Sequence, residues 1–436
     1  MLHVVVIIGR PNVGKSTLFN RLTRSRNAIV DDEPGVTRDR MHGIAIFGGK
    51  ECILIDTGGV TDEKSDLDRK IVHQVDLALD EADAVIFLAD CRTGNLNSDR
   101  SIANRLRQAS LPVFLAINKT EGLALESAVA EFHELALGQP FPISAKKGSG
   151  LSELTKAVSS NWSKASFQPK QESPRLAIIG RPNVGKSTLV NKFLGNERMI
   201  VADFPGTTRD SVSIPLRRGE EVFVLIDTAG VRRRSRTKEA IERYSVIKTL
   251  QAIADCNVAI LVLDAQHGLV EQDKAIAGLA IESGKSIVLA VNKWDGLDKH
   301  TKRQIERDLL RDYSFLPRHE AIKISVLRGN NIDRVLTSAH QAYKSALKNL
   351  PTSKLNRVLA DAVNQHPPER AGGRPIQLKY AHQGGRNPPI VVIHGNLVDR
   401  LSPPYRRYLA KYFARAFDLI GCPIQIETRT SVNPYR

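Results

Sequence analysis

Short runs of apolar, largely β-branched residues recur along the first part of the chain and alternate with longer stretches of helical character. Four such runs are Val4–Ile8, Cys52–Ile55, Val85–Ala89 and Val113–Ile117. Short buried strands that are separated by crossover helices form parallel sheets. The pattern therefore predicts an open α/β sheet.

The same arrangement occurs twice along the chain. The segment GRPNVGKSTL at residues 9–18 recurs unchanged at residues 180–189, 171 positions later, and Asp56 and Asp227 keep the same spacing. A period of this length is the size of a domain, whereas solenoid repeats are about 20–50 residues long. We therefore expect a duplicated α/β domain.

The length of the chain and its serine- and proline-containing segments predict where the domains begin and end. The 436 residues suggest about three domains. The stretch 161–174 carries serines and prolines without an apolar period, as linkers do, and Pro351 marks a second boundary. The predicted division is a first domain at residues 1–161, a linker at 162–173, a second domain at 174–350 and a third at 351–436.

The third segment has an α/β pattern of its own. Arg357–Asn364 has a helical pattern, and Ile376–Ala381 and Ile390–His394 have the patterns of strands. Pro404–Leu419 is expected to form a basic amphipathic helix, and Pro423–Glu427 a last strand.

The net charge of +16 is unevenly distributed along the chain. Residues 1–173 carry 21 Lys and Arg against 22 Asp and Glu, residues 174–348 carry 29 against 20, and residues 349–436 carry 13 against 5. Clustered positive charge favours a polyanionic partner, with RNA and anionic lipid as candidates, because binding to phosphates releases counterions. A surface charge that only aids solubility is the competing interpretation.

Other features exclude several classes of protein. No apolar run is long enough to cross a bilayer, and the short run Leu2–Ile8 lacks a basic leader, so we expect no membrane partner and no export signal. The cysteines form no CxxC pair, which argues against a zinc site or a disulfide framework and predicts a cytoplasmic location. They are Cys52, Cys91, Cys256 and Cys422.

Each repeat opens with GxxxxGK[ST] directly after an apolar strand, which is the context of a phosphate-binding loop. Backbone N–H groups and the start of a helix can surround phosphates there. We expect Lys15 and Lys186 to reach the β- and γ-phosphates, and Ser16 and Ser187 to bind Mg²⁺. The predicted loop residues are Gly9, Arg10, Pro11, Asn12, Val13, Gly14, Lys15, Ser16 and Thr17, and Gly180, Arg181, Pro182, Asn183, Val184, Gly185, Lys186, Ser187 and Thr188.

A DxxG motif ends a later strand in each copy. Its aspartate can contact Mg²⁺ through water, and its glycine N–H can reach the γ-phosphate. Thr37 and Thr208 lie on the intervening PGxTRD segments and are the natural second hydroxyl ligands of the metal. The metal-site prediction is Ser16, Thr37, Asp56, Ser187, Thr208 and Asp227, and the motif residues are Asp56, Thr57, Gly58, Gly59 and Val60, and Asp227, Thr228, Ala229, Gly230 and Val231.

The fourth apolar run of each copy is followed by a motif that selects the base. A carboxylate at Glu121 or Asp295 can accept both the ring N–H and the exocyclic amine of guanine, whereas adenine lacks this pair of donors. We therefore expect GTP and GDP as ligands, with weaker binding at the first site because Glu121 is one methylene longer than Asp295. The predicted base-contacting residues are Asn118, Lys119, Thr120, Glu121, Ser144, Ala145 and Lys146, and Asn292, Lys293, Trp294, Asp295, Ser325, Val326 and Leu327.

These motifs resemble the Der family, also called EngA, of bacterial GTPases that act in assembly of the large ribosomal subunit. The tail strengthens the resemblance, because it contains Ile393–Arg400 with the sequence IHGNLVDR and ends in Asn433-Pro434-Tyr435 before Arg436. Glu121 departs from the family pattern, as does Val326-Leu327 where Ala-Lys is usual. The resemblance implies two P-loop G domains in tandem, a C-terminal KH-like α/β domain packed between them, and a monomer whose partners are the large subunit or its precursor and rRNA.

Hydrolysis must proceed without the glutamine that follows DxxG in Ras-like enzymes, because Val60 and Val231 occupy its place. The resemblance suggests that Asn12 and Asn183 help to hold K⁺ against the phosphates, although an asparagine is also common in turns. We expect a switch that GTP orders and hydrolysis releases.

Two groups of basic residues are candidate contacts with RNA or the ribosome. One follows Gly230, where the first copy has an acidic counterpart at residues 61–68, and the other lies on the last predicted helix. The third segment lacks the GxxG loop of ordinary KH domains, and a solvated helix face is the alternative for its basic residues. The candidates are Arg232, Arg233, Arg234, Arg236, Arg406, Arg407, Lys411 and Arg415.

Two alternative functions are open at this point. A tRNA-modification GTPase would share the valine and the loop asparagine, but it would have one G domain and usually a C-terminal cysteine. A nucleotide-gated scaffold, in which the first domain only senses GTP, is the alternative that is not an enzyme.

Overall fold

The computed structural model describes most of the chain in two compact units, residues 1–169 with 237–251 and residues 170–236 with 252–436. The described residues are 2–23, 29–31, 40–57, 79, 82–109, 111–123, 129–160, 162, 173–195, 199–201, 213–219, 221–226, 238–268 and 270–430.

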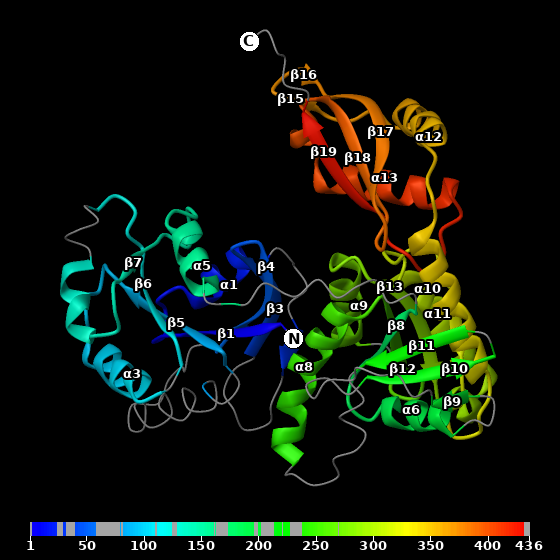
Figure 1. Cartoon of the computed structure of the whole chain (residues 1–436), viewed down its shortest axis with the longest axis horizontal. Helices are drawn as coiled ribbons and strands as arrows, with labels where there is room; N and C mark the ends of the chain where they lie inside the picture. Colours follow the sequence, from blue (N-terminus) through cyan, green and yellow to red (C-terminus); the bar gives the residue numbers. More distant parts are fainter. Residues whose placement is uncertain are drawn as a thin grey trace. The chain divides into compact units, whose positions relative to one another are not determined.

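The first unit contains a seven-stranded sheet of order β2-β3-β4-β1-β5-β6-β7 (Figure 1). Strands β4, β1, β5, β6 and β7 are parallel, and β3 joins the edge of β4 antiparallel. The strands are β1 (His3–Ile8), β2 (Ile29–Asp31), β3 (Arg40–Phe47), β4 (Lys50–Asp56), β5 (Ala84–Asp90), β6 (Val113–Asn118) and β7 (Phe141–Pro142). The helices are α1 (Lys15–Leu22), α3 (Asn97–Arg107), the 3₁₀ helix η1 (Glu131–Leu135) and α5 (Leu151–Ser159).

The four apolar runs of the sequence correspond to the central strands of this sheet. Every residue of β5 is buried, as expected where helices cover both faces of a parallel sheet. The antiparallel strand β3, which lies between β2 and β4, was not predicted. The predicted α/β class is confirmed.

A second seven-stranded sheet has the order β14-β13-β12-β8-β11-β10-β9, which is the order of the first sheet read from the other end. The duplication therefore extends from the loop sequence to the topology. The strands are β8 (Arg175–Ile179), β9 (Met199–Val201), β10 (Ile214–Arg218), β11 (Glu221–Ile226), β12 (Val258–Asp264), β13 (Ser286–Asn292) and β14 (Ala321–Lys323). The helices are α6 (Lys186–Leu194), α9 (Glu271–Glu282), η2 (Trp294–Gly296), α10 (Lys299–Asp312) and α11 (Ile332–Leu347). Helix α8 (Lys238–Asp255) belongs to the first unit up to Gln251 and to the second unit from Ala252.

The C-terminal part of the second unit has a three-stranded sheet of order β17-β18-β19, in which β17 is antiparallel and β19 parallel to β18 (Figure 1). Helices α12 and α13 share a core with this sheet, centred on Leu355, Ile393, Leu409 and Phe413. The elements are α12 (Thr352–Gln365), β15 (Arg370–Ala371), β16 (Arg374–Pro375), β17 (Gln377–Gly385), β18 (Ile390–Asn396), η3 (Val398–Arg400), α13 (Pro403–Ala416) and β19 (Gln425–Thr430).

The predicted elements of this segment occur with shifted ends. The first helix begins five residues before the predicted Arg357, and the last strand begins at Gln425, two residues after the predicted Pro423. The short pair β15 and β16 was not predicted.

The C-terminal part is joined to the second α/β sheet through Gly421. Its N–H donates to the Arg318 carbonyl at 2.7 Å, and its carbonyl accepts from the Ile287 N–H at 2.7 Å. Gly421 has φ of 64°, and a Cβ there would lie 2.8 Å from the Ile287 oxygen. Only glycine fits this close backbone approach. Among the helices that the structure describes, none combines the length and apolar character that a membrane span requires.

Candidate nucleotide-binding sites

The loop between β1 and α1 is folded around the side chain of Lys15. The ammonium is buried and donates to the carbonyls of Gly9 at 2.8 Å and Arg10 at 2.9 Å. Burial lowers the pKa of Lys15 to about 8, and the nearby Asp56 carboxylate opposes this shift. The ammonium is therefore still mostly protonated at neutral pH, with its charge paired only with carbonyl dipoles and one nearby carboxylate. A phosphate at this loop would supply the missing counter-charge.

The loop between β8 and α6 repeats this geometry. The Lys186 ammonium donates to the carbonyls of Gly180 at 2.7 Å and Arg181 at 2.6 Å. Burial lowers the pKa of Lys186 to about 8, with Asp273 opposing the shift. Two loops of identical sequence thus hold a lysine ammonium against the same two carbonyls, with Lys15 buried and Lys186 partly buried.

Two residues of each loop have left-handed backbone conformations. Asn12 and Asn183 have φ of 64° and 62°, a region that asparagine tolerates better than most residues. Gly14 has φ of 99°, and a Cβ there would lie 2.5 Å from the side-chain nitrogen of Asn118. The loop asparagines therefore have a conformational role in addition to any contact with an ion.

The residues predicted to bind Mg²⁺ are partly described. The Ser16 hydroxyl donates to Asp56 Oδ2 at 2.7 Å, so two of the first site's predicted oxygen ligands already lie side by side. A hydroxyl and a carboxylate fit Mg²⁺, which prefers oxygen ligands. Ser187 occupies the matching position at the start of α6.

Asn118 joins the phosphate loop to the loop after β7. Its amide nitrogen donates to the Val13 carbonyl at 2.8 Å, and its oxygen accepts from the Ala145 N–H at 2.9 Å. Asn292 makes the same two bonds, to the Val184 carbonyl at 2.8 Å and from the Val326 N–H at 3.1 Å. The second pair uses only the backbone of Val326, so the change from Ala-Lys to Val-Leu leaves this connection intact.

Each lysine of the base-selecting motifs pairs with an aspartate at the end of a neighbouring strand, and Lys119 also reaches the phosphate loop. Lys119 Nζ donates to the Asn12 carbonyl at 2.9 Å and pairs with Asp90 Oδ2 at 2.6 Å. Lys293 pairs with Asp264, which also contacts His267. Neither aspartate was singled out from the sequence, although Asp90 directly follows the predicted strand Val85–Ala89.

The two carboxylates expected to read guanine lie in different surroundings. Hydrogen bonding from Ser144 lowers the pKa of Glu121, and Ser325 lowers that of Asp295 in the same way. Asp295 forms an ion pair with Arg328 at 2.9 Å, whereas Glu121 Oε1 lies 3.7 Å from its nearest guanidinium, that of Arg92.

Glu121 Oε2 is buried and accepts no hydrogen bond. Buried acceptors without a donor are costly, so this oxygen is suited to an N–H group of a ligand.

We expect Glu121→Asp to tighten GTP binding at the first site by up to ~1–3 kcal/mol, because a shorter carboxylate placed as in the second site would satisfy both guanine donors. The measurement is calorimetric titration of the full chain carrying Lys186→Ala, so that only the first site reports. Asp295→Glu in a Lys15→Ala background is the matched control and should weaken binding. If Glu121→Asp weakens binding instead, the first pocket has re-formed around glutamate.

A buried ion pair in each copy was missed by the sequence reasoning. Arg10 Nε lies 3.1 Å from Asp99, and Arg181 Nε lies 3.0 Å from Asp273. Both carboxylates are fully buried, and burial raises the pKa of each while its arginine opposes the shift. The two loop arginines, predicted to line the phosphate site, thus anchor their loop to a neighbouring helix. An aspartate early in the corresponding helix of both copies is the signal that could have identified the pair.

Several predicted site residues lie outside the described part of the chain, so the structure gives no geometry for them. They are Thr37, Gly58, Gly59, Val60, Thr208, Asp227, Thr228, Ala229, Gly230, Val231, Arg232, Arg233, Arg234 and Arg236.

The basic residues of α13 are only partly available to a partner. Arg406 donates to Thr428 Oγ1 at 3.3 Å, and Lys411 donates to the Ser314 carbonyl at 3.1 Å. Arg407 and Arg415 are exposed. Two of the four candidates therefore have intramolecular partners.

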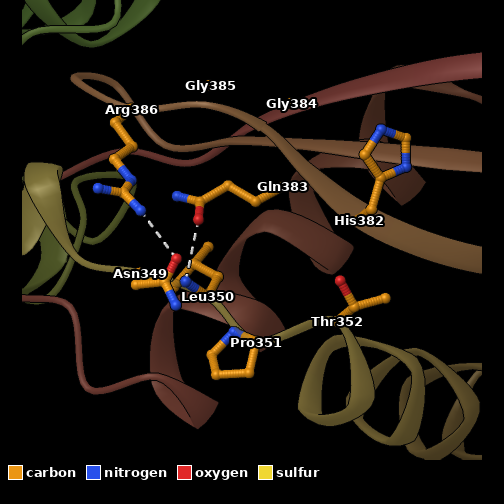
Figure 2. Close-up of a pocket in the computed structure, with 9 residues that line it drawn as sticks. All are labelled: Asn349, Leu350, Pro351, Thr352, His382, Gln383, Gly384, Gly385 and Arg386. Atoms are coloured by element: carbon orange, nitrogen blue, oxygen red, sulfur yellow. Dashed lines mark hydrogen bonds between the residues drawn. The ribbon is translucent and has the colours of Figure 1, made fainter.

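A hollow of about 570 Å³ lies where the second α/β sheet's last helix leads into α12 (Figure 2). Two hydrogen bonds lie in the wall of this hollow. Arg386 donates to the Asn349 side chain at 2.9 Å, and the Gln383 side chain accepts from the Leu350 N–H at 3.0 Å. None of its lining residues belongs to a nucleotide motif, so it is separate from the two GTP sites.

Comparison with known proteins agrees with this geometry. The family described as 50S ribosome-binding GTPase matches residues 4–119 and 175–293, and the KH-domain-like family of the C-terminal part of EngA bacterial GTPase enzymes matches residues 349–429.

Individual relatives are similar over the whole chain. A protein of Nitrosococcus oceani named GTPase Der is 48% identical over 439 residues, which cover 100% of this chain and 95% of that protein. GTPase Der of Escherichia coli O127:H6 is 45% identical over 464 residues, again covering 100% and 95%. Among solved structures, the G domain of the T. maritima FeoB iron transporter is 29% identical over 35% of this chain and 94% of its own, with a TM-score of 0.27.

Proposed function

The chain belongs to the Der family of GTPases, and we propose that it is a two-site GTP switch that acts in assembly of the large ribosomal subunit. Family membership rests on two copies of the ribosome-binding GTPase family in one chain and on relatives that match it from end to end. Family membership favours this function over that of a tRNA-modification GTPase. The observation that carries the proposal is the pair of identical loops, each of which holds the ammonium of its lysine against its own carbonyls.

Each site residue has a role in this proposal. Lys15 and Lys186 leave their loop carbonyls to bind the β- and γ-phosphates of GTP. Glu121 and Asp295 accept the N–H groups of guanine, and Asn118 and Asn292 hold the base loop and the phosphate loop in register. The boundaries at residues 161, 174 and 351 are part of the same proposal.

Mg²⁺ belongs to the proposed site because Ser16 and Asp56 present adjacent oxygen ligands. When bound, the ion neutralises charge on the phosphates. Thr37, Thr208 and Asp227 are proposed to complete the two metal sites on the switch segments.

We expect hydrolysis to be faster in KCl than in NaCl at equal ionic strength, since a cation held by Asn12 and Asn183 would offset phosphate charge. Asn183→Ala should remove much of the difference at the second site. Asn183→Gly is the matched control for backbone strain, because glycine adopts φ of 62° without strain. Since glycine also lacks the amide oxygen, this variant should lose the difference between the two salts as well. Equal rates in the two salts would contradict the role of K⁺.

Co-sedimentation with ribosomal subunits tests the proposed biology. The full chain should sediment with the large subunit in a non-hydrolysable GTP analogue and much less in GDP, because the nucleotide sets the switch segments. The small subunit is the control. Equal sedimentation in both nucleotides, or none in either, would overturn the proposed switch.

A further inference from the structure

The sheet of the C-terminal part presents one face that its helices do not cover. Core residues Ala381, Val391 and Ile393 point toward α12 and α13. Because side chains alternate along a strand, Tyr380, His382 and His394 belong to the opposite face.

Three rings form a cluster on that opposite face. The Tyr380 and His394 rings are stacked, with centroids 4.4 Å apart and planes inclined by 4°. The His382 ring lies 5.2 Å from that of His394. Tyr380 is 46% exposed although its ring is stacked on that of His394, and it lies on the edge strand β17. The cluster therefore ends in an accessible aromatic ring at an open edge of the sheet.

Positive charge lies in the same row of the sheet. Tyr380 is the register partner of His394, and His394 is the register partner of Arg429, so one side chain from each strand contributes to the row. Arg429 and Lys379 are exposed. The acidic residue of β19 that is nearest in sequence to Arg429 is Glu427. Its register partner on β18 is Val392, so it does not belong to the row of Tyr380, His394 and Arg429.

We propose that this ring cluster is a stacking platform for unpaired bases of single-stranded RNA, with Tyr380 receiving a base and Arg429 contacting the adjoining phosphate. The inference rests on the proposed ribosome-assembly function and names the RNA chemistry that it uses. Exposed aromatic rings on a sheet bind bases of any sequence because every base has a stacking face, and a neighbouring arginine supplies the phosphate contact. This site differs from the basic helix α13, where Arg406 and Lys411 already have partners within the chain.

The test is fluorescence anisotropy of a labelled twelve-nucleotide oligoadenylate titrated with the full chain. Tyr380→Ala should weaken binding by roughly tenfold, within the range of about 5- to 150-fold expected for one stacked base. Tyr380→Phe keeps the ring and should bind like the wild type. Arg429→Ala should weaken binding and lower the salt dependence by about one phosphate contact. Arg357→Ala, at an exposed position of α12, should have no effect.

Oligoadenylate binding that is unchanged in Tyr380→Ala, or that is lost in Arg357→Ala instead, would overturn the platform. If Tyr380→Ala fails to fold, a 4-thiouridine oligonucleotide cross-linked to the wild type keeps the proposal testable. The cross-linked peptides should come from β17 or β18, and cross-links confined to α13 would contradict it.

Co-sedimentation separates this inference from the proposed function. Nucleotide-dependent binding to the large subunit without any binding of oligoadenylate would leave the switch in place and refute the platform. Oligoadenylate binding through Tyr380 without subunit binding would support the platform and refute the ribosomal function.

Discussion

Replacing Lys186 by alanine is expected to abolish GTP binding at the second site and to leave the first site unchanged. The variant loses the cation that faces the β- and γ-phosphates, which costs about 2–5 kcal/mol, or roughly 30- to 5000-fold in affinity. Lys15→Ala should do the same at the first site only. The measurement is calorimetric titration with a GTP analogue, together with single-turnover hydrolysis.

This loss is expected without a loss of folding stability. Burial lowers the pKa of Lys186 to about 8, below its unfolded value, so the protonated ammonium opposes folding at neutral pH. The opposition is full below pH 8 and fades as the pH rises toward the unfolded value. The ligand-free alanine variant should therefore unfold at no lower temperature than the wild type at pH 7.

Lys192→Ala is the matched control, since Lys192 is exposed on the same helix α6. It should bind and hydrolyse like the wild type. Unchanged affinity at the second site in Lys186→Ala would show that this loop does not hold the phosphates.

Asn292→Ala should lower both the free energy of unfolding and the affinity of the second site. The change leaves the Val184 carbonyl and the Val326 N–H without their partner, and each unpaired buried group costs about 1–3 kcal/mol. We therefore expect a loss of roughly 2–6 kcal/mol in urea unfolding of the ligand-free chain. GTP affinity should fall as well, because the base loop and the phosphate loop are no longer tied together.

Asn330→Ala provides the comparison for this variant, because Asn330 is exposed in the same loop region. Its effect on stability should stay within about 0.5 kcal/mol. If Asn292→Ala unfolds like the wild type, the bridge between the two loops contributes nothing, and the site must be held by other contacts.

The fold of the two phosphate-loop segments could be predicted because it is determined by consecutive residues. A loop that begins after a buried strand and ends in Gly-Lys-Ser must fold around its lysine, and both copies do so. The parallel strands were predictable for the same reason, since full burial requires continuous apolar sequence.

Contacts between residues far apart in sequence were not predictable. The Arg10–Asp99 pair connects a loop to helix α3, and the two hydrogen bonds of Asn118 connect two loops, in each case segments that only the folded sheet brings together. Asn118 was expected to contact the base, and its structural bridging role emerged from the fold. The ring cluster of Tyr380 and His394 depends on strand register, which apolar patterning in a short strand pair does not determine.

The number of guanine nucleotides that one chain binds is the most direct test of two independent GTP sites. Native mass spectrometry of the full chain, saturated with Mg²⁺ and a non-hydrolysable GTP analogue, counts them without separating the domains. We predict two nucleotides on the wild type, one on Lys15→Ala, one on Lys186→Ala and none on the double variant. A single nucleotide on the wild type, or two on either single variant, would contradict the presence of two independent GTP sites.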